Sequence, residues 1–254
     1  MKLNIVPART GILWVKLGIQ TFLKQPLALT GLFFMYMAAV IVVAQIPVVG
    51  VVIGGMLVPA ATLGLMAASA EATKGRFPMP SILISAFRAG RQQARAMLVL
   101  GAIYTACSML ATLLGSVLAG SSPSLTETGL DVATLIALVL HTPLFLMFWH
   151  APALVHWHGV TPAKSLFFSL VACLRNFGAF SVYSLLWLVV FVAFGTLFGL
   201  AGGLIGREQL ARTVMMPAAL LMAAMFSTSI YFTFRDSFVA TSDSPAPLII
   251  GDPP

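Results

Sequence analysis

The four histidines of this 254-residue chain all lie between positions 141 and 158, within one apolar stretch. An imidazole inside a membrane helix could bind haem, a metal ion or a quinone. His141 and His150 are nine residues apart, which is about 14 Å along a helix and too far for one metal ion. His150 and His156 are about 120° out of phase on a helix, and His156 and His158 lie on poorly matched faces. The spacing therefore predicts no metal site, since no pair matches well, and His141 and His150 are kept as the candidates for cofactor binding.

The alternative role of these histidines is structural. Three of them would lie at the membrane interface beside Trp149 and Trp157, in an aromatic belt, and one would be buried. A cofactor would need ligands from other helices, yet the chain holds no other histidine, and methionine alone would be an unusual axial ligand. We therefore expect the structural role, with no cofactor.

Other signatures of enzymatic or transport chemistry are missing from the sequence. There is no Walker loop, no nucleophile elbow with its acid and base, no HExxH zinc motif and no cluster of paired carboxylates. Ion-coupled transporters and proton relays usually need charged groups in mid-span. Here Glu71 ends an apolar stretch beside Lys74 and Arg76, where we expect a local ion pair. Because Cys107 and Cys173 lie in or beside apolar helices, we expect both to be small buried hydrophobes. We expect neither an enzyme nor a coupled pump.

The composition places the chain in a membrane. Hydrophobic residues make up 59% of it and charged residues only 8%, against roughly a quarter charged in soluble domains. At about 20 apolar residues per span, we expect one all-α integral-membrane domain over residues 1–238, followed by a disordered tail over 239–254. The predicted spans are 27–45, 51–70, 97–118, 132–158, 177–200 and 213–234.

A short amphipathic segment precedes each odd-numbered span and is typical of a helix that lies on a membrane surface. These three elbow segments are 7–24, the start of 78–104, and 161–176. In the second, Arg88, Arg91 and Arg95 are three and four residues apart, so that one helix would present them on a single face. The order of elbow, span, turn and span recurs about every 80 residues. The sequence thus predicts three hairpin-like repeats, each preceded by a cytoplasmic elbow helix.

The positive charges fall mainly on one side of this arrangement. The formal net charge is +7, and twelve of the fourteen Lys and Arg residues lie on the side that the positive-inside rule assigns to the cytoplasm. This predicts both termini in the cytoplasm of a bacterial cell, and it explains the basic excess without nucleic acid as a partner. The elbows could recognise anionic lipid or simply anchor the protein. The residues expected at the membrane surface are Lys16, Lys24, Arg88, Arg91, Arg95, Lys164, Arg175, Trp149 and Trp157.

Three segments carry a resemblance to a known family: PARTGILWVKLGIQTFLKQP at the N-terminus, the polar elbow after the second span, and IYFTFRDSF near the C-terminus. Over nearly its whole length the chain resembles an uncharacterised family of proteobacterial six-span inner-membrane proteins. More distantly, it is similar to the membrane domain that accompanies some glycerophosphodiester phosphodiesterases, although it carries no phosphodiesterase domain. The resemblance implies the six-span fold and no particular activity.

The sequence leaves three functions open. The first is a non-enzymatic accessory or scaffold protein of the inner membrane, which packs its small-residue helix faces against lipids and another inner-membrane protein or complex. The second is a passive transporter or handler of an apolar or lipid-like molecule, in which spans kinked at Pro59, Pro143 and Pro217 enclose a cavity. The third is a haem-binding or quinone-binding redox subunit that uses His141 and His150.

Overall fold

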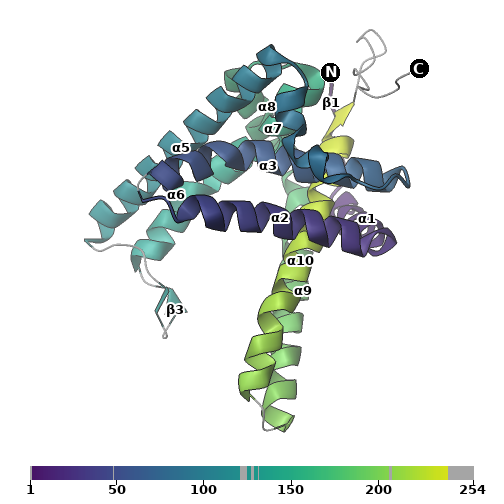
Figure 1. Ribbon diagram of the computed structural model, residues 1–254, viewed down its shortest axis with the longest axis vertical. Coiled ribbons are helices and arrows are strands. Elements are labelled where there is room, and N and C mark those ends of the chain that lie inside the picture. The colour runs from purple at the N-terminus through teal and green to yellow at the C-terminus, as the bar shows by residue number, and fades with distance from the viewer. Residues whose placement is uncertain are drawn as a thin grey trace. The chain divides into compact units, whose positions relative to one another are not determined.

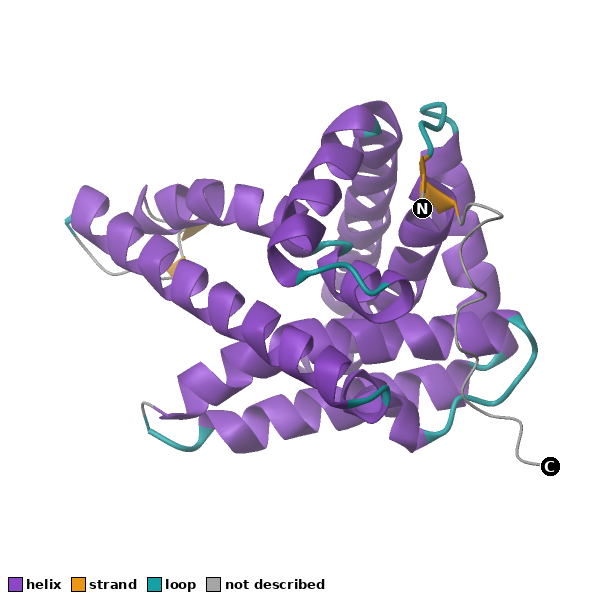
Figure 2. Cartoon of the chain, turned by 90° about the horizontal axis from the view of Figure 1, so that it is seen from above, coloured by secondary structure: helices purple, strands orange, loops and turns teal. Residues whose placement is uncertain are grey.

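The computed structural model describes residues 2–47, 49–120, 125–126, 129–130, 132–205 and 208–239, and most of them are helical (Figures 1 and 2). The helices are α1 (Thr10–Lys24), α2 (Pro26–Ala44), α3 (Val49–Thr73), the 3-10 helix η1 (Pro80–Ile84), α4 (Ser85–Arg88), α5 (Arg91–Ala119), α6 (Val132–Phe148), α7 (Ala151–His158), α8 (Pro162–Arg175), α9 (Phe177–Ile205) and α10 (Glu208–Ser237). The strands are β1 (Lys2–Leu3), β2 (Leu125–Thr126), β3 (Gly129–Leu130) and β4 (Phe238–Val239).

Six stretches of the described chain are long and apolar enough to cross a membrane. They are Pro26–Ala44, Val49–Thr73, Arg91–Ala119, Val132–His158, Phe177–Ala201 and Val214–Ser237. Each overlaps one predicted span, so the prediction of an all-α integral-membrane protein with six spans is confirmed. The single domain and the three repeats stay predictions, and the predicted tail lies outside the described residues from position 240 onwards.

The described chain divides into two compact units. Within the described residues, the first draws on 2–37, 65–83 and 174–239, and the second on 38–64 and 84–173. In the first unit α1 packs against α9 and α10, which also pack against each other, and β1 pairs with β4 in antiparallel register. In the second unit α5 packs against α6, α7 and α4.

The predicted second elbow is not one helix. Helix α4 ends at Arg88, and α5 begins at Arg91 after Gly90, whose φ of +110° is a conformation that other residues rarely adopt. This glycine interrupts the helical path between the first arginine and the other two. The prediction that Arg88, Arg91 and Arg95 share one helical face is therefore wrong, since only Arg91 and Arg95 belong to the same helix.

The fourth span is also broken, between the end of α6 at Phe148 and the start of α7 at Ala151. Pro152 lies in the first turn of α7, where a residue without a backbone N–H is tolerated because that turn's donors have no helical acceptor. Pro143 lies inside α6, which continues past it. The interruption of the predicted span thus falls at the second proline of this stretch and not at the first.

Candidate functional site

His141 is held by hydrogen bonds at both ring nitrogens. Its Nδ1 lies 2.7 Å from the carbonyl oxygen of Ala137, and its Nε2 lies 3.2 Å from Oγ of Ser108 on α5. Since a carbonyl oxygen only accepts, Nδ1 is the donor in the first contact, and Nε2 pairs with the serine hydroxyl. Neither nitrogen is then free to bind iron or another metal, so the contacts of His141 favour the structural role.

His150 lies at the break in the fourth span and is fully buried. Its backbone N–H donates to Oγ of Ser169 on α8 at 3.0 Å, and the Ser169 hydroxyl donates to the carbonyl oxygen of Leu146 at 2.8 Å. In an unbroken α-helix this N–H would donate directly to the Leu146 carbonyl. The serine hydroxyl is thus inserted into a helical hydrogen bond, which is a known cause of helix breaks.

The other two histidines are partly exposed. His156 lies on α7, with its ring centroid 6.3 Å from that of Trp157, and His158 is the last residue of α7. The structure therefore has one fully buried histidine, His150, and three that are partly exposed. Among the residues that the structure describes, no group of three His, Cys, Asp or Glu side chains could hold a metal ion.

Cys173 lies one helical turn after Ser169, on the buried face of α8. Its Sγ is 3.6 Å from the same Leu146 carbonyl oxygen. Burial raises the pKa of the Cys173 thiol to about 12, and a hydrogen bond with Ser169 opposes this rise. The thiol is therefore protonated at neutral pH, and its role is that of a buried small residue.

We expect Cys173 to resist alkylation in the native protein, because the thiolate is the reactive form. In a Cys107→Ser background, labelling by iodoacetamide near pH 8 should be slower than for an unfolded cysteine by at least about a hundredfold. The rate should rise with pH as the pKa of about 12 is approached. Mass spectrometry measures the labelling rate of Cys173 in the native protein and in protein unfolded with a denaturing detergent. Equal rates in the two states would contradict the prediction.

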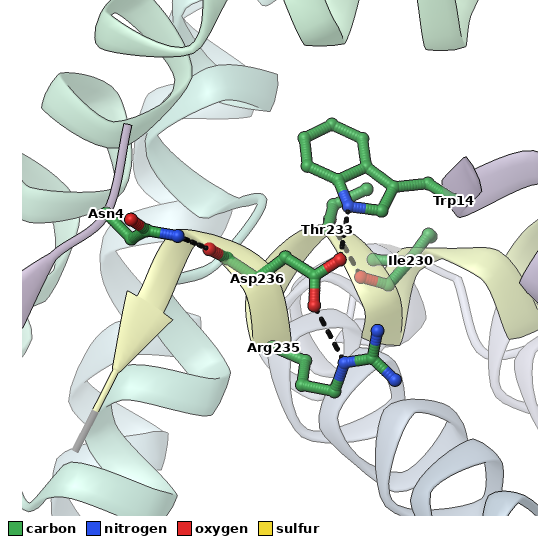
Figure 3. A network of polar contacts seen from close by, with 6 residues as sticks. All are labelled: Asn4, Trp14, Ile230, Thr233, Arg235 and Asp236. Carbon is green, nitrogen blue, oxygen red and sulfur yellow. Dashed lines mark hydrogen bonds and ion pairs between the residues drawn. The ribbon is translucent and has the colours of Figure 1, made fainter. Parts of the chain in front are cut away.

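A second polar cluster lies in the first unit, where α1 meets the end of α10 (Figure 3). The Asp236 carboxylate accepts a hydrogen bond from the indole Nε1 of Trp14 at 3.0 Å through Oδ2. Its Oδ1 accepts another from Nε of Arg235 at 2.8 Å, and its backbone carbonyl accepts one from Nδ2 of Asn4 at 2.8 Å. Both carboxylate oxygens are thus hydrogen-bonded, and the bond from Trp14 connects α1 to α10.

Asn176, just before α9, extends this cluster toward the N-terminus and is almost fully buried. Its Oδ1 accepts from the backbone N–H of Val6 at 2.8 Å, while its Nδ2 donates to the backbone carbonyl of Asn4 at 3.1 Å. Sequence reasoning missed both Asn176 and Asp236. The available signal was a polar residue next to an arginine at the end of an apolar stretch, which by itself indicates no partner.

The predicted ion pair at Glu71 is confirmed. Nη2 of Arg76 donates to Oε1 of Glu71 at 2.9 Å, and Nζ of Lys74 lies 3.6 Å from the same oxygen. All three side chains are partly exposed, so solvent screening limits the stabilisation to about 1 kcal/mol or less.

The residues predicted at the membrane surface divide into two groups. All seven basic side chains are exposed, whereas Trp149 and Trp157 are half-buried. The basic residues lie on four helices, α1, α4, α5 and α8. Their contact with lipid stays a prediction.

The chain is similar to a protein of Burkholderia thailandensis, probable inner membrane protein BTH_II0599, with 40% identity over 256 residues. The alignment covers 94% of this chain and 94% of that protein. No family model matches the chain, and no solved structure matches it. These comparisons agree with the resemblance to inner-membrane proteins, and they do not support the more distant similarity to the phosphodiesterase membrane domain.

Proposed function

Because this chain belongs to the family of the Burkholderia thailandensis inner-membrane protein, we propose that it is a non-enzymatic accessory or scaffold protein that packs against another membrane protein. The observation that carries the proposal is the exposure of α9. Each span contains an apolar stretch of 18 residues. In α9 only 6% of the residues in this stretch are buried, whereas in the other five spans the buried share is 17% to 33%. A span with so little packing inside its own chain has a large surface for a partner.

Helix α9 has a buried side near its start and an exposed apolar side along its length, on which Leu185 is already 61% exposed. On its first turns, Tyr183 and Trp187 are buried and Tyr183 hydrogen-bonds Ser229 of α10 at 2.7 Å. Further along, the large apolar side chains are more than half exposed, namely Leu188, Val189, Val192, Leu197 and Leu200. One end of α9 is thus fixed within the first unit, and the other offers an apolar surface.

Two glycines on this part of α9 support a protein partner in addition to lipid. A Cβ atom built at Gly195 or Gly199 would meet nothing within 4 Å. Small residues allow membrane helices to approach closely, and elsewhere in this chain glycines such as Gly101 are used in that way. The open glycines therefore favour the approach of a helix from another molecule.

Site-specific photo-crosslinking tests this proposal. A benzophenone side chain at Leu188 or Val192 should give an adduct of one discrete protein mass in intact membranes, whereas the same group at buried Trp187 should give none. A matching complex should survive purification in mild detergent. The proposal fails if both exposed positions yield only lipid adducts and the purified protein is a monomer.

We also propose that both termini lie in the cytoplasm. The pairing of Lys2 with Val239 and of Leu3 with Phe238 supports a common side for the two ends of the described chain, and the positive-inside rule favours the cytoplasmic side. A fluorescent protein fused to the C-terminus should therefore be fluorescent, and an alkaline phosphatase fused there should be inactive. The reverse pattern would contradict the orientation, and a phosphatase fusion in the α2–α3 turn is the positive control.

A further inference from the structure

Helix α8 has two faces of different chemistry. Its buried face is formed by Ser165, Leu166, Ser169, Ala172 and Cys173. Its exposed face carries large apolar side chains, with Phe167 61% and Leu174 56% exposed. Large apolar residues on the exposed face are contrary to the pattern of a helix that faces water, so the outer face suits the boundary between headgroups and acyl chains.

Positive charge flanks this outer face. Lys164 and Arg175 are exposed near the two ends of α8, and the helix contains no acidic residue. An amphipathic helix with exposed aromatic residues and only basic charges binds anionic membrane surfaces, through apolar burial and electrostatic attraction together. The charge and the exposed apolar residues thus favour an anionic bilayer surface as the occupant.

The buried face of α8 reaches the break in the fourth span through Ser169. Its hydroxyl bridges the His150 N–H and the Leu146 carbonyl, as described above, and Ser169 is fully buried. A shift of α8 away from the break would separate this hydroxyl from both backbone groups. The His150 N–H would then lose its acceptor and become open to exchange with water.

We propose that the outer face of α8 binds the anionic surface of the bilayer and that Ser169 transmits this contact to the break between α6 and α7. Lipid charge then sets how firmly the broken conformation of the fourth span is held. The inference does not depend on the accessory role proposed above, because it concerns a lipid surface, helix α8 and the break in the fourth span, and it involves no protein partner.

Hydrogen exchange at the His150 amide tests the lipid dependence. The full-length protein is compared in nanodiscs of phosphatidylcholine alone and in nanodiscs that also contain phosphatidylglycerol. We expect slower exchange with the anionic lipid, by up to about fivefold for each of the two basic residues. The double variant Lys164→Gln/Arg175→Gln should lose this difference. The matched control Lys16→Gln/Lys24→Gln, which removes two exposed charges from α1, should keep it.

The variant Ser169→Ala tests the link itself. Exchange at the His150 amide should become faster by about fivefold or more and should no longer respond to lipid charge. The amides of α8 should still respond, because the outer face is intact, and Ser169→Thr should restore the response at His150. If Ser169→Ala does not fold, the two double variants decide the question. Equal exchange of the wild type in both lipids, loss of the difference in the α1 control, or a lipid response at His150 that survives in Ser169→Ala would overturn the proposal.

Discussion

Replacing Gly101 with alanine is expected to destabilise the protein by about 3 kcal/mol, although alanine is the better helix former. A Cβ atom at Gly101 on α5 would overlap the carbonyl oxygen of Met56 on α3 and would lie only 2.9 Å from its Cα atom. These are backbone atoms, which cannot rotate away as the end of a side chain can. The two helices would have to separate, and the contacts around them would be lost. Unfolding in a mixed-detergent titration, followed by tryptophan fluorescence, measures the change.

The matched control is Gly195→Ala on α9. A Cβ there meets nothing within 4 Å, so only helix propensity changes, and the purified protein should be unaffected or more stable by up to about 1 kcal/mol. If the two variants change the free energy of unfolding equally, the close approach of α5 and α3 is not what determines the effect at Gly101.

Replacing Trp14 with alanine is expected to cost about 4 kcal/mol, near the upper end for a core substitution. Trp14 lies on α1 and is fully buried against α9 and α10. Its ring centroid is 5.2 Å from that of Phe180 and 6.0 Å from that of Tyr183. Truncation removes these ring contacts and also the hydrogen bond to Asp236. The free energy of unfolding and the mobility of α1, read from a spin label at exposed Lys16, should both report the loss.

Smaller changes separate the ring from its hydrogen bond. Trp14→Phe keeps an aromatic ring but removes the donor to Asp236, which should cost about 1 to 3 kcal/mol. Asp236→Ala removes the acceptor, and the double variant should be less destabilised than the sum of the two single variants by about 1 kcal/mol. A coupling energy near zero in this cycle would mean that the bond seen in Figure 3 contributes no stability.

Features that depend on neighbouring residues along the chain could be predicted. Helix α2, Pro26–Ala44, lies within one residue of the span predicted over 27–45. The ion pair of Glu71 with Lys74 joins residues one helical turn apart. In both cases the decisive property is local: an uninterrupted apolar run must satisfy its backbone hydrogen bonds within itself in a membrane, and charges one turn apart on a helix lie close together.

The second elbow shows where local reasoning was wrong. Spacing alone placed Arg88, Arg91 and Arg95 on one helix, but Gly90 adopts a positive φ and separates the first from the others. A helical pattern in the sequence cannot tell whether a glycine within it continues the helix, because glycine accepts both conformations at little cost.

The sequence by itself determined that this is a six-span helical membrane protein, because the length and composition of apolar runs are read one segment at a time. Only the tertiary structure decided what its histidines and its few polar residues do. Ser169 reaches the backbone of His150 from another helix, and Trp14 reaches Asp236 across 222 residues of sequence. Such pairings depend on which helix faces lie against each other, and this follows from packing of the folded chain, which no local pattern specifies.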